Sequence, residues 1–313
     1  MNALSVFDAV DLAANVCQPV QHVKEKWTKF FINGDEMKLS QKLRTDNRFA
    51  KFSEYGLINV GITTGNNGYF SVTEDVTNHY HLEEATLPLI GRSSHAHGIY
   101  FTEADWNLNK TAGKPARLVR FPDAPYEDYP QGYRDYIMAG EARSEHVGYK
   151  CSIRDRWYIV PSVWVPDAFF LRRNNLYPKF VLNCCGAVST VTMPRMKSKN
   201  GVAPENVLLA YYNSVSFAFT EICGRSYGGG VLEILPGEMG NILIPKIQYI
   251  DHVFRSELLQ EIDHVVRNDD DIEKALDLVD REVLIKLLGI EQEICSQCRV
   301  LWKKMQRRRL GRG

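Results

Sequence analysis

Basic residues recur at every second or fourth position in the segment YKCSIRDRWYIVP, residues 149–161, and aromatic residues lie beside them. Successive side chains of an extended strand point to opposite faces, so one face would carry the cations. That face would hold Lys150, Ser152, Arg154 and Arg156. Such a row suits contacts with phosphates and with guanine edges, Lys150 being a candidate for phosphate alone. Trp157 and Tyr158 would pack behind the strand or reach a groove; the competing interpretation is a solvated sheet face.

A glycine-rich segment, GRSYGGG at 224–230, predicts a loop with an accessible backbone. Its members are Arg225, Ser226, Tyr227, Gly228, Gly229 and Gly230. Backbone amides next to a guanidinium and a hydroxyl can hold a phosphate. A tight, crowded turn before the strand-like VLEIL is the alternative.

The residues Gly65, Asn66, Asn67 and Gly68 separate a Val/Ile run from a Tyr/Phe run. Glycine and asparagine tolerate positive φ, so this segment predicts a β-hairpin turn. On a DNA-binding protein, the turn would face the nucleic acid.

Motifs of common enzymes are absent from the sequence. It contains no GxSxG, GxxxxGK[ST] or HExxH pattern. His95 and His97 are predicted to lie in a surface loop, and Glu282 and Lys286 to form a helical salt bridge. Cys295 and Cys298 fit two positions on one side of a helix. No catalytic residue and no metal ligand is therefore predicted.

Three sections follow from the periodicity, and together they predict an α+β fold. Residues 1–50 are a helical flank, with apolar residues such as Val23 and Trp27 at helical spacing. Residues 51–250 are rich in β-branched and aromatic residues and turn signals, which predicts mostly strands with a few helices, among them VLLAYYNSVSFAFTEICG. Residues 251–313 change to a helical period and predict a hairpin or small bundle of helices.

The formal charge of zero, from 38 basic and 38 acidic residues, hides a strong segregation along the chain. Residues 141–200 carry ten basic and four acidic residues, a net of +6. Residues 251–294 have a net of −8, and the last 15 residues carry seven Lys or Arg and no acid. This asymmetry indicates a basic surface for a polyanion.

The chain has no apolar stretch long enough to span a bilayer and no recognisable signal peptide. Its seven cysteines are too few for a disulfide scaffold of this length. We expect a cytoplasmic protein.

Several segments together resemble the C-terminal part of adenine-specific DNA methyltransferases of restriction–modification systems. In chain order these segments are VGITTGNNGYF (60–70), IYFTEADW (99–106), YKCSIRDRWYIVPSVWVPDAFFL (149–171), KFVLNCCGAVST (179–190), NSVSFAFTEICGRSYGGGVLEILPGE (213–238) and the ending KKMQRRRLGRG. The resemblance covers roughly residues 22–313. It implies a target-recognition domain at 51–250, related to the recognition domains of type I specificity subunits.

In that family, a catalytic domain that binds S-adenosylmethionine precedes the recognition domain. Its hallmark is an Asn/Asp-Pro-Pro-aromatic tetrapeptide, but this chain contains no Pro-Pro dipeptide. The matching region also begins within about 25 residues of Met1, which leaves no room upstream for a domain of roughly 200 residues. The resemblance therefore implies double-stranded DNA as a partner, no catalysis by this chain, and S-adenosylmethionine on a separate methyltransferase domain or subunit.

Two further hypotheses remain open. The chain is a divergent or truncated methyltransferase or nuclease with activity of its own, which binding of S-adenosylmethionine would support. Alternatively, it is an assembly module whose acidic and basic C-terminal helices pair or dock on a partner.

Overall fold

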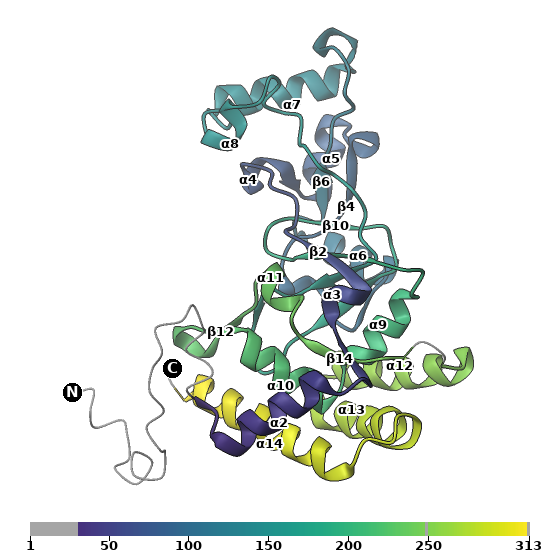
Figure 1. Cartoon of the computed structure of the whole chain (residues 1–313). Coiled ribbons are helices and arrows are strands. Elements are labelled where there is room, and N and C mark those ends of the chain that lie inside the picture. Colours follow the sequence, from purple (N-terminus) through teal and green to yellow (C-terminus); the bar gives the residue numbers. More distant parts are fainter. Residues whose placement is uncertain (1–30, 248–249, 312–313) are drawn as a thin grey trace, which may run out of the picture.

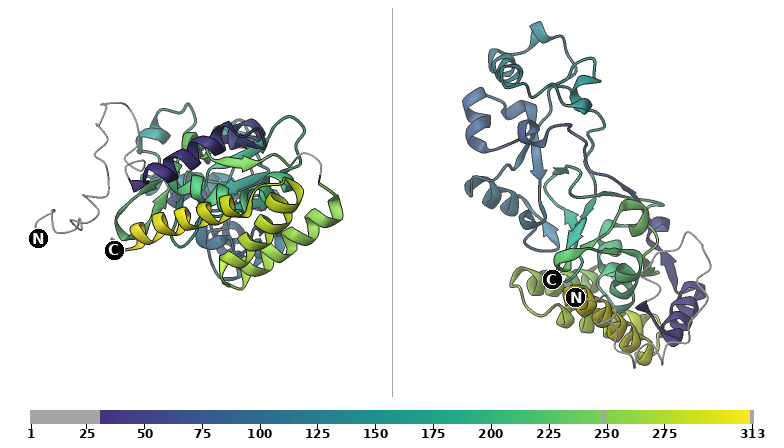
Figure 2. Two further views of the ribbon diagram at one scale, coloured as in Figure 1. Left: turned by 60° about the horizontal axis from the view of Figure 1, so that its bottom comes forward. Right: turned by 90° about the vertical axis from the view of Figure 1, so that its left-hand side faces the viewer.

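The computed structural model describes residues 31–247 and 250–311. Figure 1 shows an elongated molecule, with α4, α5, α7 and α8 at one end and the C-terminal helices at the other. The right-hand view of Figure 2 shows the same elongation from the side. We call these two ends the upper and lower parts. Val23 and Trp27, which carried the predicted N-terminal helix, lie outside the described residues.

The upper part is built on a four-stranded sheet in the order β10-β4-β6-β3. The strands are β3 (Ser71–Val72), β4 (Thr86–Ile90), β6 (Arg117–Val119) and β10 (Val188–Ser189). β4 and β3 are antiparallel to β6, whereas β10 is parallel to β4. The surrounding helices are α4 (Asn67–Phe70), α5 (Glu74–Tyr80), α6 (Glu103–Thr111), α7 (Gln131–Ala142) and α8 (Tyr149–Ser152), with short 3-10 turns at Glu83–Ala85, Ser93–His95 and Tyr126–Asp128.

A five-stranded sheet, in the order β2-β11-β7-β9-β5, forms the centre of the molecule. Its strands are β2 (Gly56–Asn59), β5 (Tyr100–Phe101), β7 (Ala168–Phe170), β9 (Phe180–Asn183) and β11 (Arg195–Ser198). β7 is buried along its whole length. Phe170 pairs with Phe180 on β9, and their rings stack with centroids 4.4 Å apart.

Helices dominate the lower part. They are α2 (Gly34–Thr45), α9 (Pro204–Tyr211), α10 (Ser214–Cys223), α12 (His252–Arg267), α13 (Ile272–Val279), a π-helical continuation of α13 at Asp280–Leu287, and α14 (Gln292–Leu310). Helices α9 and α10 confirm the helical prediction for this apolar segment. Asn213 separates them and starts α10, because its side chain accepts a hydrogen bond from the Ser216 amide at 2.9 Å. α10 packs along α14, where the rings of Phe217 and Trp302 lie 5.3 Å apart.

Two small sheets and two one-turn helices complete the lower part. β1 (Phe49–Lys51) pairs with β14 (Leu243–Pro245), and β13 (Leu232–Glu233) lies between β12 (Arg225–Ser226) and β8 (Arg173–Asn174). The short helices are α3 (Phe52–Tyr55) and α11 (Pro236–Met239).

The α+β class and the helical C-terminal region are as predicted, but the prediction of mostly strands for residues 51–250 is wrong. The strands there are two to five residues long, and helices lie between them. Polar residues cause this outcome: Thr73 and Thr102 accept hydrogen bonds from first-turn amides and so start α5 and α6.

Opposite charges on α13, its continuation and α14 form ion pairs inside the lower part. Arg299 of α14 forms ion pairs with Glu273 at 3.2 Å and with Asp280 at 3.1 Å, and it also reaches Asp277. Lys303 likewise pairs with Glu273. These ion pairs hold the acidic α13 and its continuation to the basic α14. Docking of the C-terminal helices on a partner stays a hypothesis.

A tight joint connects the upper and lower parts. Gly61 lies so close to the neighbouring chain that a Cβ there would be 1.8 Å from the carbonyl oxygen of Thr190. Arg195, which is 5% exposed, donates from Nε to Val60 O and from Nη1 to Ser162 O, both at 3.1 Å. It thereby ties together two of the segments that connect the central sheet with the upper part. Among the described residues, no helix is both long and apolar enough to cross a membrane.

Candidate nucleic-acid interface

Two of the predicted contact segments, 65–67 and 149–158, lie against each other in the upper part. A Cβ on Gly65 would lie 2.9 Å from Cys151 Sγ and 3.0 Å from Lys150 Cβ, and Gly65 has a φ of +86°. Glycine is needed here both for that φ and for the close approach. The structure thus brings together Gly65 and Lys150, which are far apart in the sequence.

The predicted hairpin at Gly65–Gly68 is wrong, because Asn66 starts helix α4 instead. Its Oδ1 accepts a hydrogen bond from the Tyr69 amide at 3.3 Å, as an N-cap residue does. Its Nδ2 donates to Glu145 Oε2 at 2.5 Å. The exposed Asn67 uses Oδ1 to accept from Thr64 Oγ1 at 2.6 Å.

The predicted basic strand at 149–158 is also wrong. The chain forms helix α8 and then a series of turns, so its cations do not share one face. Arg154 donates from Nη2 to the carbonyl oxygen of Thr63 at 3.0 Å and from Nη1 to that of Trp157 at 3.2 Å. Arg156 donates to Asp123 and to the Ala124 carbonyl. Both guanidinium groups therefore hold the loops together.

Trp157 and Tyr158 pack inside the upper part, which was one of the two roles predicted for them. Trp157 lies with its ring 4.9 Å from that of Tyr69, and its Nε1 donates to Glu141 Oε1 at 3.0 Å. Tyr158 is 7% exposed and meets Phe121 edge to face. Tyr158 is buried and Trp157 half-buried, so groove contact stays a prediction for Trp157 only.

An exposed surface remains over α4 and α8, and we call it the α4–α8 surface. It consists of Asn67, Val147, Tyr149, Lys150 and Ile153. The Lys150 side chain has no acidic partner among the described residues and lies with Nζ 5.5 Å from the Tyr149 ring centroid. Tyr149, Val147 and Ile153 were not among the predicted contact residues. The sequence does show three apolar residues around a lysine at 147–153, which could have indicated this surface.

The glycine-rich segment forms a hairpin between β12 and β13, closed by a bond from the Tyr227 amide to Val231 O at 2.9 Å. Arg225 pairs with Glu238 at 2.7 Å. Ser226 Oγ is buried and has no hydrogen-bond partner among the described residues. Tyr227 is 48% exposed.

The three glycines of this hairpin differ in their surroundings. A Cβ on Gly228 or Gly229 would meet no atom within 4 Å, whereas one on Gly230 would touch Leu310 of α14 at 3.0 Å. Gly229 has a φ of +72°. The hairpin tip is therefore open to solvent at Gly228 and Gly229 and anchored at Gly230. It belongs to the lower part: α8 and β12 lie at opposite ends of the left side of Figure 1.

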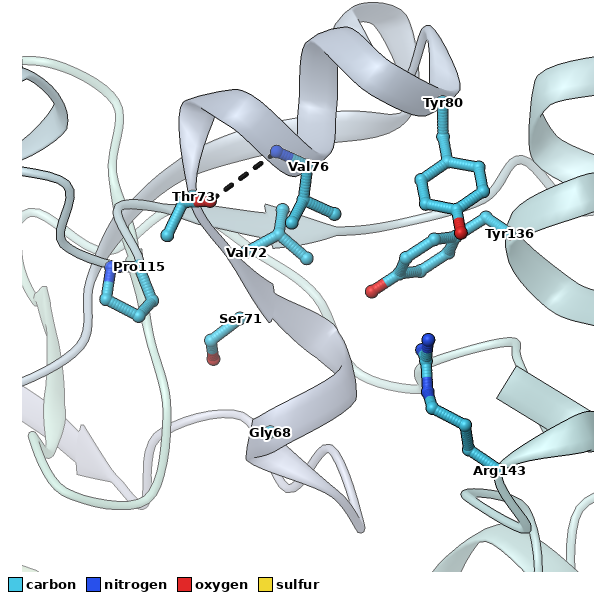
Figure 3. A pocket seen from close by; sticks show the side chains of 9 residues that line it. All are labelled: Gly68, Ser71, Val72, Thr73, Val76, Tyr80, Pro115, Tyr136 and Arg143. Carbon is cyan, nitrogen blue, oxygen red and sulfur yellow. Dashed lines mark hydrogen bonds between the residues drawn. The ribbon is translucent and has the colours of Figure 1, made fainter. Parts of the chain in front are cut away.

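A hollow of about 330 Å³ lies behind α4 in the upper part. Its walls are Gly68, Ser71, Val72, Thr73, Val76, Tyr80, Pro115, Tyr136 and Arg143. Figure 3 shows the half-exposed Arg143 pointing toward the phenol groups of Tyr80 and Tyr136, with Ser71 farther across the hollow. Arg143 also reaches Glu145 at 3.5 Å, and Glu145 binds Asn66, so this hollow is linked to α4. A second hollow, of about 390 Å³, lies beside the Lys197–Asp167 ion pair of the central sheet.

His95 is buried, in contrast to its predicted place in a surface loop. It is 3% exposed, and its Nδ1 accepts from the Gly91 amide at 3.2 Å. Burial, together with the nearby charges of Lys114 and Arg92, lowers its pKa to about 4. Among the described residues, no cluster of three or more His, Cys, Asp or Glu side chains is arranged to hold a metal ion.

Comparisons with known proteins match most of the chain. Residues 24–284 match the family model of the C-terminal domain of type II methyltransferase M.Eco57I. Type II methyltransferase M.AccI of Acinetobacter calcoaceticus is 21% identical over 241 residues, which are 75% of this chain and 42% of that protein.

Solved structures of restriction–modification enzymes are also similar. The type IIG restriction endonuclease BpuSI has a TM-score of 0.54 and 13% identity, over 88% of this chain and 33% of that one. The type IIL restriction–modification enzyme MmeI, solved in complex with DNA, has a TM-score of 0.41 and 11% identity, over 82% of this chain and 36% of that one. The chain spans less than half the length of each of these relatives.

Proposed function

Because this chain belongs to the family of the C-terminal domain of type II methyltransferase M.Eco57I, we propose that it recognises a specific sequence of duplex DNA for a methyltransferase of a restriction–modification system. Residues 51–250 would be the target-recognition domain, flanked by the N-terminal segment and by the C-terminal helices. It acts in the cytoplasm, and the cysteines of the described residues, all free thiols, fit a reducing compartment.

The observation that carries this proposal is the α4–α8 surface. Lys150 offers an ammonium group that no carboxylate of the described chain neutralises, which is what a phosphate contact needs. Asn67 of α4 is exposed and offers its Nδ2 group, and asparagine reads the N6 and N7 edge of adenine in the major groove. The packing of Gly65 on Cys151 fixes α4 against α8, so that both groups stand on a rigid support.

The triple-glycine hairpin supplies a second contact. The open sides of Gly228 and Gly229 allow a phosphate to approach the backbone closely, and Tyr227 adds an exposed aromatic ring. Arg225 contributes a cation, partly compensated by Glu238. Contacts at both ends of one side of the molecule would fix the register of the duplex.

Methyl transfer, in this proposal, is the task of a catalytic domain or subunit that binds S-adenosylmethionine and modifies adenine N6. The adenine-binding Asn/Asp-Pro-Pro-aromatic tetrapeptide is not in this sequence, which supports that division of labour. The rival hypothesis of intrinsic activity predicts that the chain alone binds S-adenosylmethionine. Isothermal titration calorimetry separates the two, since heat of binding by the isolated chain would contradict a recognition-only role.

Fluorescence anisotropy with a labelled random-sequence duplex tests DNA binding directly. We expect affinity that falls linearly with salt on logarithmic axes, followed by recovery of one sequence when a random pool is selected on the protein. Lys150→Gln should lower the salt slope by about one. Lys286→Gln, a change to an exposed lysine paired with Glu282 on the π-helical segment, is the matched control. Salt-insensitive or absent binding by the wild type would reject the proposal.

A further inference from the structure

Three large apolar side chains are exposed within seven residues in and next to α8 of the upper part. Val147, Tyr149 and Ile153 are 65%, 72% and 59% exposed. Single exposed apolar residues are ordinary, but a contiguous group marks a contact surface.

The helical turn of α8 places two of these side chains on one side. The Ile153 amide donates to the Tyr149 carbonyl at 3.3 Å, so the two residues are four apart on a single turn and their side chains are neighbours. Lys150 follows Tyr149 directly, and its Nζ lies beside the Tyr149 ring. The result is an apolar ridge with a cation at its edge.

This ridge stands on a rigid base. Cys151, in the same turn, is fully buried against Gly65. Arg154, directly after Ile153, is bonded to the carbonyls of Thr63 and Trp157. Tyr149 and Ile153 are therefore held out into solvent by neighbours that are anchored in the core, and nothing in the described chain covers them.

The charged residues around the ridge indicate which class of partner covers it. Residues 143–154 contain Arg143, Lys150 and Arg154 against a single acid, Glu145. That acid is already engaged by Asn66 and Arg143. The next acids on either side are Glu141, bonded to Trp157, and the exposed Asp155. Lys150 is the cation of the α4–α8 surface, and no acid of the described residues pairs with it. An apolar ridge with such a cation at its edge suits DNA, because the cation holds a phosphate while apolar side chains enter the base stack.

Resting on the proposed DNA-binding function, we propose that Tyr149 and Ile153 form a wedge that enters the minor groove and separates two neighbouring base pairs. Lys150 contacts the phosphate beside the opened step. Apolar wedges of this kind unstack a step and kink the duplex by roughly 20–90°. The site would thus recognise deformability at a flexible step as well as base edges.

The test uses a duplex recovered by selection on the full chain, labelled at both ends for energy transfer and carrying 2-aminopurine at single positions. For the wild type, we expect a shorter end-to-end distance and increased 2-aminopurine fluorescence at one step. The double variant Tyr149→Ala/Ile153→Ala should bind roughly tenfold or more weakly, in line with the loss of stacking on an aromatic ring. It should also lose the kink and the fluorescence. Tyr149→Phe should keep both.

Control variants separate the wedge from folding and from DNA binding as such. Val253→Ala removes an apolar side chain of similar exposure, 62%, from α12 in the lower part and should change nothing. The double variant should melt like the wild type, because both side chains are exposed.

Four outcomes decide the proposal. A straight, stacked duplex in a tight wild-type complex would overturn the wedge and leave the DNA-binding function standing. Unchanged affinity and kinking by the double variant would also overturn the wedge and leave the DNA-binding function standing. If the double variant instead lost only its association with a methyltransferase subunit, the ridge would be a protein interface and the wedge would be wrong. No DNA binding by the wild type would reject both proposals.

Discussion

Arg309, near the end of α14, forms a fully buried ion pair with Glu221 of α10. Its Nη2 lies 2.9 Å from Glu221 Oε1, and the two side chains are 1% and 2% exposed. Arg309 also donates to the carbonyls of Asn175 and Gly230. A single guanidinium therefore fastens α14 to α10 and to the base of the triple-glycine hairpin.

We expect Glu221→Gln to destabilise the protein by about 3–5 kcal/mol, because removal of one partner leaves a buried charge uncompensated. Urea unfolding followed by circular dichroism measures this loss. Asp270→Asn breaks the exposed pair with Lys274 and should leave the unfolding midpoint almost unchanged. Equal unfolding midpoints for the two variants would show that the buried pair stabilises the protein no more than the exposed pair does.

The buried His95 predicts a specific dependence of stability on pH. Its pKa is lowered to about 4 in the folded protein, against about 6.5 in an unfolded chain. Between these two pKa values, His95 binds a proton in the unfolded chain but stays neutral in the folded protein. Its contribution to stability is therefore complete above pH 6.5 and is lost as the pH falls toward 4, by up to roughly 3 kcal/mol.

Urea unfolding at pH 7, 5.5 and 4.5 measures this loss, with His95→Asn as the comparison. Asparagine can keep an acceptor for the Gly91 amide and does not titrate, so the decline should be shallower in the variant. An NMR titration that placed the folded-state pKa of His95 near 6.5 would contradict the prediction.

Gly61 should tolerate no side chain. A methyl group there would overlap the Thr190 carbonyl and force residues 59–62 away from β10, where the Ile62 amide donates to Ser189 O at 2.7 Å. We expect Gly61→Ala to cost about 3 kcal/mol or more and to expose the joint to limited proteolysis. Gly237→Ala, where a Cβ meets nothing within 4 Å, is the control. Equal protease resistance of both variants would mean that the joint adjusts.

Regular periodicity could be read from the sequence wherever burial is nearly complete. The apolar run of α9 and α10, although not its division into two helices at Asn213, was predicted as helix from its own pattern. The same holds for Cys295 and Cys298, which both lie on the buried side of α14.

The region around α4 and α8 could not be predicted, because distant partners decide its conformation. Arg154 is bound by a carbonyl 91 residues away, at Thr63, and Arg156 by Asp123, 33 residues away. An alternating pattern of charges in the sequence does not indicate which distant residues these side chains contact. The role of Lys150 in binding phosphate remains a prediction, since its exposure allows that contact without requiring it.

The tip of the triple-glycine hairpin separates a structural role from a DNA-binding role. Gly229 has positive φ, so Gly229→Ala should cost roughly 1–2 kcal/mol in stability even though a Cβ would touch nothing. Gly228 has no such φ and equal space around it, so Gly228→Ala should leave urea unfolding nearly unchanged. If a phosphate approaches the backbone here, the added methyl group of Gly228→Ala must still weaken DNA binding in the anisotropy titration. A hairpin that serves only the fold would give wild-type affinity in Gly228→Ala, and its loss of binding in Gly229→Ala would follow the loss of stability.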